Sequence, residues 1–219
     1  MGVLSDNDKK YVKELFEKEL TDPVKLIIFK TKGWEYFDSL REVLDDIVEL
    51  SVGKLSYEVH SYENEKELTE KYQVDKAPII VITRNGEDLG VRFAGTPFGY
   101  EFSAFLEAII GVSKAKTDLP EEVKELLKQV DKPVKIEVYV TPSCPYCPMA
   151  VSTAHKFAIE NENIIGEGVE AYEHEELANK YGVSAVPHIV INEGAHMFVG
   201  AYPPKEFAYE VLKAIGKLQ

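Results

Sequence analysis

The chain has few cysteines, no long apolar run and no surplus of basic residues. Only two of its 219 residues are cysteine, which excludes a framework of several disulfides. No apolar stretch is long enough to span a bilayer, and the first residues lack the pattern of a secretory signal, so we expect a cytoplasmic protein with no membrane partner. A net charge of −13 argues against nucleic acid as a partner, because phosphate binding needs a basic face.

The two cysteines lie close together in an otherwise ordinary globular composition, which is 45% hydrophobic and 29% charged. Cys144 and Cys147 enclose Pro145 and Tyr146, follow an apolar run at residues 134–140, and precede a helical pattern. A cysteine pair between a strand and a helix places one sulfur at the helix N-terminus, where backbone N–H groups and the helix dipole stabilise a thiolate. The motif predicts a thiol–disulfide redox centre.

The chain repeats itself at a spacing of roughly half its length. Residues 71–82, KYQVDKAPIIVI, match residues 180–191, KYGVSAVPHIVI, at seven of twelve positions. Residues 24–37 correspond in the same way to residues 134–147, with Val, Lys, Thr and Tyr in register. A period this long is typical of tandem domains rather than of a solenoid.

The boundary between the copies falls in the polar run SKAKTD, just before Pro120. It predicts an N-terminal unit at residues 1–116 and a C-terminal unit at residues 117–219, each with a core of its own. Apolar strand patterns alternate with helical patterns in both copies, and a turn at Asn85-Gly86 precedes the last strand of the first copy. We therefore expect an α/β fold of two tandem thioredoxin-like units, each a central mixed sheet flanked by helices.

The cysteine motif at a helix start, followed downstream by Val186-Pro187, resembles the thioredoxin and glutaredoxin superfamily. The tandem arrangement is similar to the protein disulfide oxidoreductases of thermophilic archaea and bacteria. The resemblance implies that Cys144 is the exposed nucleophile and Cys147 the resolving thiol, with their disulfide as the redox group and no bound cofactor. It also implies a cis peptide bond before Pro187, so that Val186 and Pro187 shape a substrate groove.

The residues between the cysteines have expected places beside this groove. Pro145 suits the first position of the helix, because its missing N–H would have no partner there. Tyr146 is expected to shape the surface near the site.

The first copy departs from the family pattern at the place of the motif. It has Trp34, Glu35, Tyr36 and Phe37 there, with Ala77-Pro78 in the place of Val186-Pro187. No sulfur remains, so the N-terminal unit cannot be a dithiol catalyst. Two interpretations stay open: the aromatic residues fill the core of a retired site, or they form a contact patch for a peptide or protein.

Three further residues are candidate modulators of the thiols. His188 follows Pro187 and would stabilise the Cys144 thiolate if protonated, or else it points away from the site as an ordinary strand residue. Glu137 interrupts an apolar strand and could accept the Cys147 proton, although thioredoxins keep their buried acid at the position of Val138, on the other face. Glu170 on the neighbouring strand is a second candidate acceptor.

A metal site is not expected. Zinc would need two further Cys or His ligands, and neither His155 nor His174 has the spacing of a ligand. An iron–sulfur cluster shared between two chains remains an alternative.

These features predict a protein disulfide oxidoreductase that exchanges dithiols and disulfides in protein substrates at one site. The resemblance suggests a thioredoxin reductase-like flavoprotein as electron donor. Two alternatives are a glutathione-dependent glutaredoxin-type reductase, which the Cys-Pro-Tyr-Cys sequence itself resembles, and a non-catalytic, chaperone-like binding module.

Overall fold

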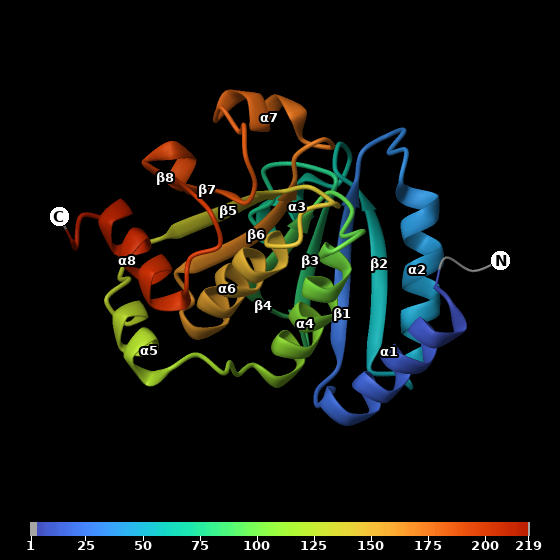
Figure 1. Cartoon of the computed structure of the whole chain (residues 1–219). Helices are drawn as coiled ribbons and strands as arrows, with labels where there is room; N and C mark the ends of the chain where they lie inside the picture. The colour runs from blue at the N-terminus through green and yellow to red at the C-terminus, as the bar shows by residue number, and fades with distance from the viewer. Residues whose placement is uncertain (1–3, 219) are drawn as a thin grey trace.

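Eight strands form one mixed sheet in the computed structural model, which describes residues 4–218 (Figure 1). Their order across the sheet is β2-β1-β3-β4-β6-β5-β7-β8. The strands are β1 Val24–Lys30, β2 Leu55–Ser61, β3 Ile79–Arg84, β4 Glu87–Ala94, β5 Val134–Val140, β6 Ile164–Glu170, β7 His188–Ile191 and β8 His196–Val199. The mixed α/β class expected from the sequence is confirmed.

Helices cover both faces of this sheet. They are α1 Asp6–Glu19, α2 Phe37–Leu50, α3 Lys66–Lys71, α4 Glu101–Lys114, α5 Glu121–Leu127, α6 Cys147–Glu160, α7 Glu175–Lys180 and α8 Pro204–Ala214, with a short 3-10 turn at Asn192–Gly194. Apolar residues of α1, α2, α4, α5, α6 and α8 share one buried cluster, and α3 and α7 flank a smaller cluster that includes Tyr139 and Val169. None of the helices within residues 4–218 is long and apolar enough to cross a membrane.

The strand order of the first half, β2-β1-β3-β4, recurs in the second half as β6-β5-β7-β8. The two halves join where β4 pairs in parallel with β6, with residues 91–94 opposite residues 166–169. Pairing these strands satisfies backbone groups that an open sheet edge would leave exposed. The expectation of two separate sheets is therefore wrong, and the boundary at residues 116 and 117 stays a prediction.

The expectation of two separate cores is also wrong, because α4 and α6 pack side by side at the centre of the molecule (Figure 1). The larger apolar cluster runs through both halves, from Phe16 of α1 to Phe207 of α8. The sequence of α4, EFSAFLEAIIGVSK, has apolar residues on most of its circumference. A helix of this kind is stable only when it is covered on several sides, here by the sheet and by α6.

Six of the strands run in one direction, and β3 and β7 run against them. The ends of β1, β4, β5, β6 and β8 consequently meet the beginnings of β3 and β7 at one edge of the sheet. The cis-prolines Pro78 and Pro187 and the cysteine pair lie at this edge. Binding sites in α/β folds commonly lie at the carboxyl ends of the parallel strands.

Candidate redox site

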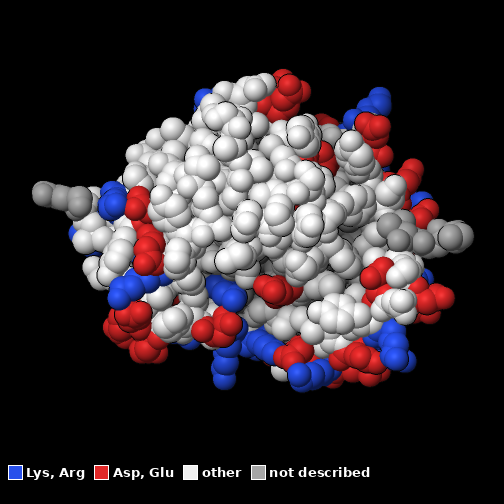
Figure 2. Space-filling view, in the orientation of Figure 1, with Lys and Arg blue, Asp and Glu red and all other residues white. Residues whose placement is uncertain are grey.

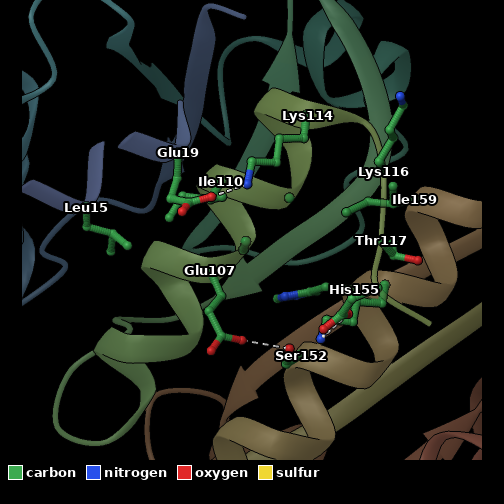
Figure 3. Close-up of a pocket in the computed structure, with 14 residues that line it drawn as sticks. Leu15, Glu19, Glu107, Ile110, Lys114, Lys116, Thr117, Ser152, His155 and Ile159 are labelled. Atoms are coloured by element: carbon green, nitrogen blue, oxygen red, sulfur yellow. Dashed lines mark hydrogen bonds and ion pairs between the residues drawn. The ribbon is translucent and has the colours of Figure 1, made fainter. Parts of the chain in front are cut away.

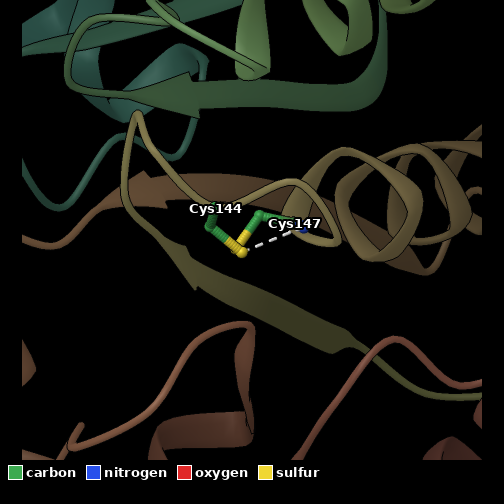
Figure 4. The surroundings of a disulfide bond; sticks show 2 residues. All are labelled: Cys144 and Cys147. Atoms are coloured by element: carbon green, nitrogen blue, oxygen red, sulfur yellow. Dashed lines mark hydrogen bonds between the residues drawn. A yellow bond between two sulfur atoms is a disulfide. The ribbon is translucent and has the colours of Figure 1, made fainter.

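Cys144 and Cys147 form a disulfide at the N-terminus of α6 (Figure 4). Cys144 is 7% exposed and Cys147 is fully buried, so a substrate can reach only the first sulfur. The backbone N–H of Cys147 donates to Cys144 Sγ at 3.2 Å. In the reduced protein this N–H and the helix N-terminus stabilise a thiolate at Cys144.

The residues around the disulfide form a partly apolar rim. Tyr146 is 66% exposed beside the site, whereas Pro145 lies in the turn before α6. The prediction that Pro145 occupies the first helical position is wrong, because α6 begins at Cys147 and Pro148 takes the place in its first turn. In Figure 2 charged side chains gather along the lower rim of the molecule, and the part over the start of α6 is uncharged.

The Val186–Pro187 peptide bond is cis, as the resemblance implies. Pro187 is buried and Val186 is half-buried. Within residues 4–218 the backbone N–H and C=O of Val186 make no hydrogen bond. Free backbone groups at a sheet edge can pair with an extended polypeptide.

Glu101, the first residue of α4, is a buried acid that the sequence analysis missed. It is 2% exposed, and neither carboxyl oxygen has a partner among the described residues. Burial raises the pKa of Glu101 to about 8. The preceding residue binds the redox loop, because Tyr100 N–H donates to the Pro142 carbonyl at 3.0 Å. The first turns of α4 and α6 therefore lie together.

A signal for Glu101 exists in the repeat but is ambiguous. Glu206 holds the equivalent position in the second copy and is exposed. Only the packing of α4 against α6 buries Glu101, and such long-range packing cannot be read from the helix sequence.

The three candidate modulators lie in different surroundings. Glu137 pairs with Lys76 at 2.9 Å and shares its sheet face with Tyr139, away from α6. His188 is opposite Tyr139 on that same face, and burial lowers its pKa, so the ring is neutral. Glu170 lies on the α6 face, where its carboxylate accepts the Glu173 N–H at 2.7 Å. Their functional roles stay predictions.

The degenerate motif lies at the same sheet edge as the cysteines, but it is not buried. Trp34 and Phe37 are half-buried, with ring centres 5.7 Å apart, and Glu35 and Tyr36 are exposed. The Trp34 Nε1–H donates to Glu173 of the second half at 2.6 Å. These positions favour the contact-patch interpretation over core filling.

A buried charge network joins the halves on the face of α3 and α7. The Lys76 ammonium lies 2.9 Å from Glu137 and 2.7 Å from Glu167, and all three side chains are at most 7% exposed. Arg92 and Lys135 extend the network around Glu167. Buried charges of this kind are tolerated only when they are paired.

A separate cavity of about 480 Å³ lies between α1, α4 and α6 (Figure 3). His155 lines it and is neutral, because burial lowers its pKa to about 4 against the opposing effect of a hydrogen bond to the Arg92 carbonyl. The cavity contains no cysteine. Within residues 4–218 no group of three or more His, Cys, Asp or Glu side chains is arranged to hold a metal ion.

Comparisons with known proteins agree with this geometry. The thioredoxin domain model matches residues 134–213. A protein disulfide oxidoreductase from Aeropyrum pernix K1 superposes with a TM-score of 0.86 and is 33% identical, with 100% of this chain and 97% of that chain covered. The alkylhydroperoxide reductase AhpF of Enterococcus faecalis has the same fold, with a TM-score of 0.86 at 24% identity over 95% of this chain and 99% of that one.

The curated relatives are longer proteins. NADH dehydrogenase of Bacillus subtilis is 28% identical over 56% of this chain and 24% of its own length. The corresponding alkyl hydroperoxide reductase protein of Escherichia coli is 26% identical over 87% of this chain and 34% of its own length. The chain thus matches between a quarter and a third of these relatives.

Proposed function

The chain belongs to the protein disulfide oxidoreductases, and on that basis we propose that it exchanges dithiols and disulfides in protein substrates through the Cys144–Cys147 pair. The observation that carries the proposal is the asymmetry of the pair, with one reachable sulfur and one buried sulfur at a helix N-terminus. Exchange needs an attacking thiolate and a second thiol close enough to resolve the mixed disulfide.

In the reducing direction the Cys144 thiolate attacks a substrate disulfide. One S–S bond forms between Cys144 and a substrate sulfur, the substrate S–S bond breaks, and the other substrate sulfur leaves as a thiolate. The Cys147 thiolate then attacks Cys144 Sγ, forms the internal disulfide and releases the second substrate thiolate. Two electrons have passed from the protein to the substrate, and the reverse sequence oxidises a substrate dithiol.

Glu101 is the proposed acceptor of the Cys147 proton. Its carboxyl is buried at the start of α4, beside the start of α6, and makes no competing hydrogen bond within residues 4–218. Its pKa of about 8 lies near the ordinary pKa of a thiol, about 8.5. Proton transfer between groups of similar pKa is nearly balanced in free energy, which suits a step that must run in both directions.

A thioredoxin reductase-like flavoprotein is the proposed electron donor. The matches to proteins named as an alkyl hydroperoxide reductase and an NADH dehydrogenase support a donor of the reductase class. In those relatives the matched region is joined to a further length of chain.

Reduction of insulin disulfides by dithiothreitol tests the proposal. We expect the wild-type protein to accelerate the reaction, Cys144→Ser to abolish the acceleration, and Cys147→Ser to accumulate a mixed disulfide through Cys144. Full activity of Cys144→Ser would contradict the proposal. Faster reduction of a glutathionylated peptide by glutathione than of insulin would instead favour the glutaredoxin-type alternative.

A further inference from the structure

Two cavities at the redox edge of the sheet share one wall, Tyr172. The first, of about 370 Å³, lies beside the redox site and is lined by Thr141 and Val186 among others. The second, of about 280 Å³, lies at the degenerate motif and is lined by Trp34 and Pro78 among others. Tyr172 lines both and is 74% exposed, so the two cavities are neighbouring parts of one groove.

The second cavity has the chemistry of a site for a cation. Trp34, Tyr36 and Tyr172 supply three aromatic side chains, and Glu35 and Glu173 supply two carboxylates. No Lys or Arg of the described residues lines it. Aromatic faces and carboxylates together attract an ammonium or guanidinium group.

Hydrogen bonds across the two halves hold this cavity in shape. Glu173 accepts the Trp34 Nε1–H at 2.6 Å and the Thr96 backbone N–H at 2.7 Å. Trp34 is thereby oriented as a wall of the cavity, and the exposed Glu35 is left to meet a ligand. A wall held in place before binding loses little conformational entropy when a ligand arrives.

The cavity also adjoins a free backbone edge like that of the redox site. Ala77 precedes the cis-proline Pro78, is half-buried, and makes no backbone hydrogen bond within residues 4–218. Val186 has the same exposure and the same free groups beside Pro187. An extended segment can therefore pair with both edges in turn.

We propose that the second cavity binds a Lys or Arg side chain of an extended substrate polypeptide whose sulfur reacts at Cys144. This assignment rests on the proposed function, because it concerns the substrates of the same redox site. The net charge of −13 favours basic segments in general, and the cavity selects where the basic residue sits.

The sheet sets the spacing between the two subsites. In the order β1-β3-β4-β6-β5, the redox loop after β5 lies three strands from β3 and four from β1. Neighbouring strands are about 4.8 Å apart, so the subsites are separated by roughly 14–19 Å. An extended chain advances about 3.3 Å per residue, which corresponds to about four to six residues between the basic residue and the reactive cysteine.

A series of peptides tests this spacing. Each carries one cysteine as a mixed disulfide with thionitrobenzoate and one Lys placed two to ten residues away on either side, in a Gly-Ser background. We expect kcat/KM for chromophore release to peak at about four to six residues on one side, about three- to tenfold above the Gln-substituted peptide. A profile that is flat with position would overturn the proposal.

Variants separate the cavity from the redox centre. Tyr172→Ala and Glu35→Gln are expected to remove the peak and leave the rate with the Gln peptide unchanged. Tyr11→Ala is the matched control, because Tyr11 is similarly exposed, at 61%, but lies on α1. A peak that survives in Tyr172→Ala at full height would overturn the assignment.

Binding can be followed without any exchange reaction. Trp34 is the only tryptophan of the chain, so its fluorescence reports on the cavity directly. In Cys144→Ser, peptides with Lys at the preferred spacing are expected to change this fluorescence at lower concentration than their Gln counterparts. Equal titrations would overturn the cavity assignment, whereas absent exchange with intact Lys-dependent binding would overturn only the proposed redox function.

Discussion

Replacing Lys76 with methionine is expected to destabilise the protein by about 3–5 kcal/mol, because buried carboxylates lose their cation. Lys76 is 7% exposed, and its partners Glu137 and Glu167 are 5% and 1% exposed. Glu167 keeps Lys135 at 3.5 Å after the substitution. Glu137 has no other ion pair within residues 4–218, so most of the cost is expected there.

The pH dependence of this loss has a definite sign. Burial acts to raise the pKa of Glu167, but Lys76 and two further basic side chains outweigh it and hold the pKa below the ordinary value. A carboxylate of this kind stabilises the fold above its unfolded pKa, about 4.3, and that stabilisation is lost as pH falls through the lower, folded pKa. In Lys76→Met the carboxylates can be protonated, so the deficit is largest at neutral pH and shrinks toward about pH 4.

Urea unfolding at pH 7 and pH 5, followed by circular dichroism, measures the deficit. For a chain of this size it corresponds to a fall in Tm of roughly 6–20 °C. Lys25→Met is the matched control, because Lys25 and Glu58 form an ion pair with both side chains 46% exposed, worth less than about 1 kcal/mol. The reasoning is refuted if Lys76→Met loses no more than this control, or if adding Glu137→Gln recovers none of the loss.

Two further substitutions test how the N-terminal half serves the redox site. Glu101→Gln is expected to slow insulin reduction at pH 7 by about tenfold or more, with recovery as pH approaches the thiol pKa near 8.5, whereas the exposed Glu206→Gln leaves the profile unchanged. Since burial raises the pKa of Glu101 to about 8, the native state loses stability between about pH 4.5 and 8, and Glu101→Gln should be the more stable protein by a growing margin there, as urea unfolding across that range will show. Gly99→Ala is expected to lower both Tm and activity, because Gly99 has a φ of +63° and an added Cβ would overlap the Pro142 carbonyl; unchanged values would contradict the close packing of α4 on the redox loop.

The retention of a half without sulfur has a physical explanation in this structure. The N-terminal half supplies β4, which pairs with β6, and α4, which packs against α6. Its Tyr100 N–H binds the carbonyl of Pro142 in the loop before Cys144, and its Glu101 is the buried acid beside the start of α6. Deleting this half would expose an apolar helix face and an open sheet edge, so the redox unit depends on it.

Local patterns account for what could be predicted. Strand and helix periodicity is a short-range property, and it was sufficient for the α/β class and the alternation of elements. Sulfur chemistry depends on a four-residue motif at a helix start, so Cys144 and Cys147 were found directly. The strand register was equally informative, since it placed Glu137 on the face away from α6, where the structure has it.

Contacts between the halves account for what could not be predicted. The expectation of separate cores was wrong because nothing local indicates that β4 pairs with β6 rather than ending a sheet. The same packing decides that Glu101 is buried while its repeat counterpart Glu206 is exposed. It also joins Trp34 to Glu173, so that a retired motif forms a cavity with a residue 139 positions away.

The sequence by itself determined the alternation of strands and helices, the redox chemistry and the loss of one of two sites, because each is written in short stretches of residues. Only the tertiary structure decided which acid lies beside the cysteine helix, where the buried charges find partners, and how the two halves share one sheet edge. Those properties depend on burial and distance between segments far apart in the chain, and burial is what moves a carboxyl pKa and makes an aromatic group a wall of a cavity.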